Sequence, residues 1–162
     1  MKNKNVSIIT VGAMTAALYV VLTLVANAFG LANYAIQVRF SEALTILPYF
    51  TPAAIPGLFV GCILSNLITG CMPLDVLFGS LATLLGALGT YSLRKCKWAA
   101  PIPPIIANTI IVPFVLAYVY HFEGSIPYFM VTVGIGEIIS CGVLGMILLN
   151  VLDKYKDKIF VS

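Results

Sequence analysis

Three charged side chains stand apart in this sequence because so few others accompany them. Arg39 and Glu42 lie three residues apart in IQVRFSEAL (36–44), and Glu137 lies in GIGEIIS (134–140). Only 9% of the residues are charged, and no charged residue separates Lys4 from Arg39. In apolar surroundings such groups bind polar ligands, pair with one another or move ions, so each is a candidate functional residue.

Glu137 is the strongest candidate, because its own stretch of chain offers no partner. No basic residue lies three or four positions away, so no neighbour on the same helix neutralises it. For Arg39 and Glu42 two interpretations stay open. Either they contact a ligand, or they form an i,i+3 pair whose charges only neutralise each other.

Asn66, Asn108 and Asp75 extend this set of polar groups. We expect Asn108 at nearly the depth of Glu137, and Asn66 and Asp75 nearer the outer surface. Alternatively, the two amides hydrogen-bond helices together, and Asp75 caps a helix N-terminus. The apolar segments predict a bundle of transmembrane helices, which is derived below, and all six groups lie in its outer or middle part. This placement favours one outward-facing pocket over a pore that is lined with polar groups along its length.

Catalytic and metal-binding patterns are missing from the sequence. His121 is the only histidine, and the four cysteines have no metal-ligand spacing. Neither a GxxxxGK[ST] phosphate loop nor a nucleophile elbow occurs. We therefore predict no catalytic residue, no metal site and no cofactor in this chain. If the protein moves a solute uphill, it needs a partner that binds ATP, or an ion gradient.

The composition is that of an integral membrane protein. The chain has 162 residues, is 60% hydrophobic and has a mean hydropathy of +1.04. Soluble domains carry about 25% charged residues. A soluble chain this short cannot hide so much apolar surface, because much of a small domain stays exposed.

The basic residues decide how many helices cross the membrane. Eight of the nine lie in three clusters, at 2–4, 94–97 and 154–158, which the positive-inside rule places in the cytoplasm. Five helices would put the middle cluster outside, whereas six put all three inside. We predict one all-α domain, residues 1–162, with cytoplasmic termini and transmembrane helices at about 6–29, 35–50, 53–69, 75–93, 99–120 and 126–152.

Small residues recur at helical spacing and let helices approach closely in lipid. Two such stripes are expected to pack inside the bundle: Ala53, Gly57 and Gly61, and Gly79, Ala82, Gly86 and Gly89. The stripe of the first helix fits either internal packing or a partner protein, and consists of Gly12, Ala13, Ala16 and Ala17.

Two stretches carry a resemblance to a known family. VRFSEALTILPYFTPAAIPGLFVG (38–61) and DVLFGSLATLLGALGTY (75–91) resemble the QueT family, and the resemblance runs over nearly the whole chain. Members are substrate-binding S components of energy-coupling-factor (ECF) transporters, assigned to uptake of queuosine precursors. Ala13 and Ala17 form an AxxxA that is similar to the alanine motif by which S components dock onto the transmembrane T component.

The resemblance implies the six-helix S-component bundle, with the first helix as docking face and a pocket open to the outside. It also implies the partners, a T component with two ATPase subunits, and a location in a prokaryotic plasma membrane. The implied ligand is a 7-deazaguanine: the 7-aminomethyl precursor base, its cyano analogue or queuine.

The candidate residues suit such a ligand. A guanine edge presents two adjacent N–H donors, which one carboxylate accepts side by side, and we assign this role to Glu137. Glu42 is assigned to a protonated aminomethyl group. Donors for the ring carbonyl are Asn108, Asn66 or Arg39, and the candidate walls for the flat ring are Phe40, Tyr34 and Tyr128.

Other classes of protein remain as alternatives. The main one is an autonomous secondary transporter or channel for a small polar solute. A membrane scaffold without a ligand comes next, and an intramembrane enzyme last.

Overall fold

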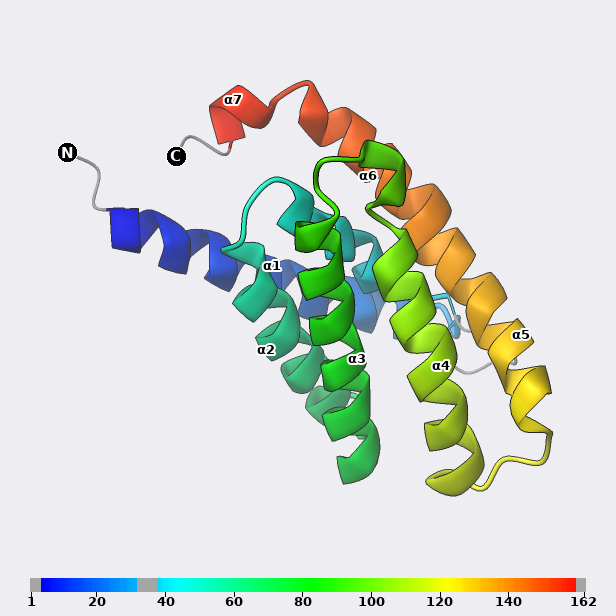
Figure 1. Ribbon diagram of the computed structural model, residues 1–162. Coiled ribbons are helices and arrows are strands. Elements are labelled where there is room, and N and C mark those ends of the chain that lie inside the picture. The colour runs from blue at the N-terminus through cyan, green and yellow to red at the C-terminus, as the bar shows by residue number, and fades with distance from the viewer. Residues whose placement is uncertain (1–3, 32–37, 160–162) are drawn as a thin grey trace.

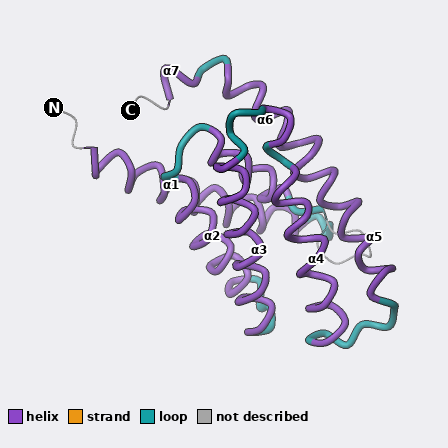
Figure 2. The backbone as a smooth tube through the Cα atoms, in the orientation of Figure 1, coloured by secondary structure: helices purple, strands orange, loops and turns teal. Residues whose placement is uncertain are grey.

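The structure is a computed structural model that describes residues 4–31 and 38–159, and no strand occurs in these two segments (Figure 2). The α-helices are α1 (Lys4–Ala28), α2 (Ala54–Ile68), α3 (Pro73–Ser92), α4 (Ile102–Tyr118), α5 (Ile126–Glu137), α6 (Gly145–Asp153) and α7 (Lys156–Ile159). Three other helices are η1 (Phe40–Tyr49), η2 (Lys97–Ala99) and η3 (Ile138–Leu144). Since α5, η3 and α6 follow without a break, they form one long helix (Figure 1).

Four of these segments are long and apolar enough to cross a membrane: Val6–Ala28, Pro73–Ser92, Lys97–Tyr118 and Ile126–Asp153. The helix α2 is apolar but shorter, and η1 is the sixth segment. The prediction of an all-α fold with six helices is thereby confirmed.

The second helix differs from its predicted form. Its described part begins only at Phe40 and is a 3₁₀ helix of 10 residues, not an α-helix over 35–50. Two residues explain the tighter winding. Pro48 has no N–H to donate to an α-helical bond. The Thr45 hydroxyl donates a hydrogen bond to the Glu42 carbonyl oxygen, 2.6 Å away. Runs of 3₁₀ helix this long are uncommon and often mark functional segments.

The element η1 lies at the centre of the bundle. Every residue from Ser41 to Pro48 is buried. Its Ile46 packs in one apolar cluster with Leu58 of α2 and Leu149 of α6, and none of the three is measurably exposed. The central position of η1 brings its polar residues within reach of the surrounding helices.

The contacts of α1 with α2 establish the direction of each helix. A side chain at Gly57 would meet Gly12, and one at Gly61 would meet Ala16, so α1 and α2 run parallel. Two consecutive helices can be parallel only if the chain crosses back between them, and η1 makes this crossing. The start of α1, the loop after α3 and the end of α6 therefore lie at the same end of the bundle.

An ion pair joins the middle basic cluster to the end of α6. Lys97 Nζ lies 3.0 Å from Asp153 Oδ2, which places the loop after α3 beside the end of α6. Both side chains are about 30% exposed, so screening by solvent makes the pair a weak contribution to stability. The arrangement agrees with the count of six helices, and the cytoplasmic orientation stays a prediction.

The predicted packing of the small-residue stripes is confirmed. A Cβ added at Gly86 would lie 2.7 Å from the Cα of Pro104, and one at Gly89 would lie 2.4 Å from the Cβ of Pro103. These glycines let α3 and α4 touch near the loop that joins them. Toward their other ends the two helices diverge (Figure 1).

Two native cysteines test the orientation. Cys96 is exposed in the loop predicted to be cytoplasmic, and Cys71 is half-buried in the turn between α2 and α3, predicted to be outside. In intact cells a membrane-impermeant maleimide should label the Cys96→Ser variant, because Cys71 remains and faces outside. It should not label the Cys71→Ser variant, whose Cys96 faces the cytoplasm. Permeabilised cells are the control, in which Cys96 should also react. The opposite pattern in intact cells would invert the topology.

Candidate functional site

Glu42 is held by donors from two different helices. It is 1% exposed, the Tyr19 hydroxyl of α1 donates to Oε1, and Asn108 Nδ2 of α4 donates to Oε2 at 3.4 Å. Its backbone carbonyl accepts from Thr45, which keeps η1 tightly wound at this point. Both oxygens of this carboxylate are thus engaged by neutral donors.

Glu137 approaches the same point from the long C-terminal helix. It is the last residue of α5, and the seven residues of π-helix that follow begin at Ile138. Cys141 lies four residues on, and its thiol donates to Glu137 Oε2 at 3.2 Å. Wider π-helical turns inside α-helices frequently occur at functional sites.

Glu42, Glu137 and Cys141 form one buried cluster, which we call the carboxylate cluster. Each offers one oxygen or sulfur atom, and these atoms lie within 4.8 Å of one another. Glu137 is 7% exposed and Glu42 only 1%, so Glu137 is the more accessible carboxylate. By donor type the three could hold a divalent cation; the prediction that the chain has no metal site stays a prediction.

The ion pair that the spacing of Arg39 and Glu42 allows is absent. Arg39 precedes η1 in an extended conformation, so the i,i+3 geometry of a helix does not apply to it. No salt bridge among the described residues involves either side chain. The backbone N–H of Arg39 donates to Ser140 Oγ at 3.2 Å, and its charge still acts on Glu42 and Asp75. The structure therefore shows no direct ion pair between Arg39 and Glu42, and both interpretations of the two charges stay predictions.

Asn66 and Asp75 meet beside Gly79. A Cβ at Gly79 would lie 3.3 Å from Asn66 Nδ2 and 3.4 Å from Asp75 Oδ1, so the glycine leaves room for both polar groups. Both are buried, with exposed fractions of 2% and 6%. Asp75 is not the N-cap of its helix: α3 begins at Pro73, and the cap residue is Met72.

Asp75 is instead tied to the loop after α4. The Tyr120 hydroxyl donates to Asp75 Oδ2 at 2.8 Å and accepts from the Met72 N–H at 3.2 Å. Burial raises the pKa of Tyr120 above its ordinary value, and the bond to Asp75 adds to this, so the hydroxyl stays protonated and donates. These two bonds join the start of α3 to the end of α4 across their diverging ends.

Replacing Tyr120 by Phe should open this tie at a modest cost. One hydrogen bond contributes about 1 kcal/mol, and more to a charged acceptor, so we expect a loss of about 1–2 kcal/mol in the free energy of unfolding. Faster exchange of the Met72 amide hydrogen would report the opening directly. Tyr118→Phe, at a ring that is 66% exposed, is the matched control. Equal exchange in both variants would contradict the role of Tyr120.

Of the three aromatic residues predicted to line the site, only Phe40 is close in sequence to a residue of the carboxylate cluster. Phe40 is half-buried at the start of η1, two residues from Glu42. Tyr128 is 50% exposed and stacks edgewise on Phe129, nine residues before Glu137, so it lies outside the carboxylate cluster. Tyr34 falls outside the described residues.

The stripe of the first helix divides between two faces. Gly12 and Ala16 pack against α2, at Gly57 and Gly61 respectively, so they serve the bundle itself. Ala13 and Ala17 are exposed. An α-helix turns 100° per residue, which separates neighbouring positions onto different faces. The predicted docking surface is thereby reduced to Ala13 and Ala17.

Cys141 belongs to the carboxylate cluster and Tyr19 donates to it, but neither residue was predicted from the sequence. Tyr19 is the only tyrosine in the first apolar stretch, and a hydroxyl in lipid requires a partner, which was a usable signal. Cys141 lies at i+4 from Glu137, a spacing that places both on one helix face.

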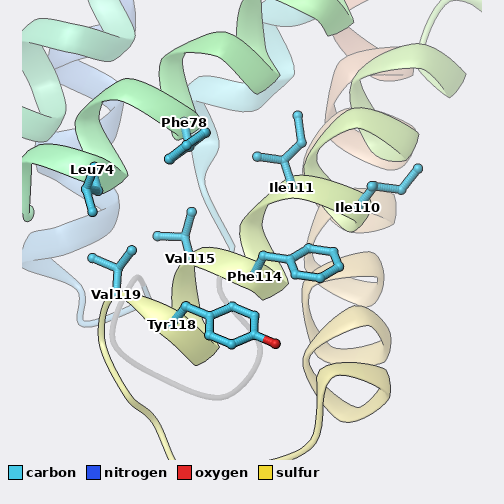
Figure 3. A pocket seen from close by; sticks show the side chains of 8 residues that line it. All are labelled: Leu74, Phe78, Ile110, Ile111, Phe114, Val115, Tyr118 and Val119. Carbon is cyan, nitrogen blue, oxygen red and sulfur yellow. The ribbon is translucent and has the colours of Figure 1, made fainter.

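An apolar groove lies apart from this cluster, where α3 and α4 diverge (Figure 3). It has a volume of about 460 Å³ and is lined by Leu74, Phe78, Ile110, Ile111, Phe114, Val115, Tyr118 and Val119. None of these residues offers a charged group, so the groove does not suit a charged or strongly polar ligand.

Comparison with known proteins gives the family. The profile of the QueT transporter family matches residues 9–154, nearly the whole chain. A relative named "Queuosine precursor transporter QueT", from Lactococcus lactis subsp. cremoris, is 36% identical over 84 residues, 52% of this chain and 48% of that protein. The aligned segment thus spans about half the length of the relative. No solved structure matches the chain. This multi-pass membrane protein belongs to the QueT transporter family.

Proposed function

We propose that the chain captures a queuosine precursor outside the cell, as the S component of an ECF-type importer in the plasma membrane. A T component and two ATPase subunits would then drive delivery to the cytoplasm. Membership of the QueT family and the name of the Lactococcus relative support the substrate. The observation that carries the proposal is the convergence of Glu42, Asn108 and Glu137, from three segments far apart in the sequence, on one buried point.

The chemistry of this point suits a 7-deazaguanine. Two adjacent N–H donors of the ring edge match the two oxygens of a carboxylate, and Glu137 is the more accessible of the two. A protonated aminomethyl group would lower the repulsion between the neighbouring carboxylates. The 7-aminomethyl base is therefore the preferred ligand, ahead of the cyano analogue and queuine.

Thermal unfolding of the purified protein in detergent tests the proposal. The three deazaguanines are compared with guanine, riboflavin, folate and thiamin. A ligand at 100 times its Kd stabilises the folded state by about 2.7 kcal/mol, which raises the melting temperature measurably. If only a vitamin raises the melting temperature, that vitamin is the substrate in place of a deazaguanine. If no compound raises it, the proposed function is overturned.

A second candidate function is an autonomous, ion-coupled transporter. The observation in its favour is the same carboxylate cluster, because buried acidic pairs in transporters carry protons. Uptake of the ligand in cells that lack the ATPase subunits separates the two functions. Uptake that persists supports the autonomous transporter, and uptake that stops supports the ECF importer.

A further inference from the structure

One residue of α1 reaches into the proposed site. Tyr19 is 1% exposed, and its hydroxyl donates to Glu42 Oε1 although 23 residues separate the two in the chain. Its Cβ lies 2.8 Å from the place of a Cβ at Gly61, and the residue belongs to the buried apolar cluster that includes Ile46 of η1 and Leu58 of α2. The side chain therefore begins beside α2, and its hydroxyl reaches one oxygen of the carboxylate.

A second hydrogen bond ties the same face of α1 to the same turn of η1. Thr23 lies one helical turn after Tyr19, and its Oγ1 is 2.9 Å from the Oγ of Ser41, the neighbour of Glu42. The same Oγ1 lies 2.9 Å from the Tyr19 carbonyl. Two successive residues of η1 are thus bonded to two successive turns of α1.

The bond fixes how Glu42 faces its neighbours. With Tyr19 at Oε1 and Asn108 at Oε2, the carboxylate plane has one orientation relative to Glu137. Without the Tyr19 hydroxyl, Oε1 would lose this donor, while Oε2 would keep the longer bond from Asn108, at 3.4 Å. The side chain would then rotate, and the spacing between the two carboxylates would no longer be set.

We propose that Tyr19 is a positioning residue for substrate binding: it orients Glu42 from α1 and so makes the affinity of the site depend on where α1 lies. The inference rests on the proposed function. Of the four long apolar helices α1 is the least buried, and it packs on α2 and η1. The seam with α2 and the two bonds to η1 therefore set its position relative to Glu42.

The test is calorimetric titration of 7-aminomethyl-7-deazaguanine into the purified protein. Tyr19→Phe keeps the ring and removes the donor, and we expect it to weaken binding about tenfold, as for a lost bond to a charged group. Tyr49→Phe is the matched control, because Tyr49 ends η1 with its ring against Phe50, 5.0 Å between centroids. It should bind as the wild type does.

Two further variants separate positioning from a general loss of structure. If Tyr19 acts through Glu42, the loss caused by Tyr19→Phe should shrink to within about twofold when Glu42 is already Gln. Thr23→Val cuts the other bond to η1 and should weaken binding about threefold, which tests the link even if Tyr19→Phe folds poorly. A wild type that binds no deazaguanine overturns the proposed function, and this inference with it. A wild type that binds, with unchanged affinity in both α1 variants, overturns the inference alone.

Discussion

The Glu137→Gln variant is expected to bind 7-aminomethyl-7-deazaguanine at least tenfold more weakly than the wild type, a change of about 1.4 kcal/mol or more. A carboxylate accepts both N–H groups of the ring edge. Gln accepts one and turns its own N–H₂ toward the other, so that a donor faces a donor. In a buried site the unpaired donor also loses its bond to water.

The ligand-free variant should be at least as stable as the wild type, because one of two neighbouring carboxylates has become neutral. Affinity and melting temperature are therefore expected to move independently, which excludes unfolding as the reason for weaker binding. Glu123→Gln, at an exposed glutamate of the loop before α5, is the control. If Glu137→Gln binds as tightly as Glu123→Gln, Glu137 does not contact the ligand.

The shared level of Glu137 and Asn108 could be predicted, because level along a transmembrane helix follows from counting residues. Glu137 lies 11 residues into its helix, about 16 Å at 1.5 Å per residue, and α4 places Asn108 beside Glu42. The count of helices followed equally from charge. Both inferences need only the order of residues along the chain, because a bilayer fixes the length and the orientation of each helix that crosses it.

Contacts between distant segments could not be predicted in this way. A direct i,i+3 ion pair between Arg39 and Glu42 is absent because η1 begins at Phe40, so helical spacing does not apply to Arg39. Tyr19 falls within the predicted first helix, and spacing does not reveal its contact with Glu42, because that partner is 23 residues away and on another element. Spacing also could not tell which of Gly12 and Ala13 faces α2, because that depends on how α1 is rotated.

The rotation of α1 is set by the seam that it shares with α2, so a change in this seam should have a large effect. A Cβ at Gly57 would lie 2.4 Å from the Gly12 carbonyl oxygen and 2.9 Å from the Thr15 Cβ. The first contact is with backbone, which cannot rotate away, so α1 as a whole must move. We expect Gly57→Ala to lower the free energy of unfolding by about 3 kcal/mol, although Ala usually favours a helix over Gly.

Gly134→Ala separates this packing effect from helix propensity. A Cβ there would lie 3.5 Å from the Thr109 side chain, an ordinary contact, so the control should be neutral or stabilising. Unfolding in mixed detergent micelles measures both. Because Tyr19 moves with α1, Gly57→Ala should also weaken ligand binding under conditions where it remains folded. A variant as stable as Gly134→Ala, with wild-type affinity, would mean that α1 and α2 are not packed as closely as the structure places them.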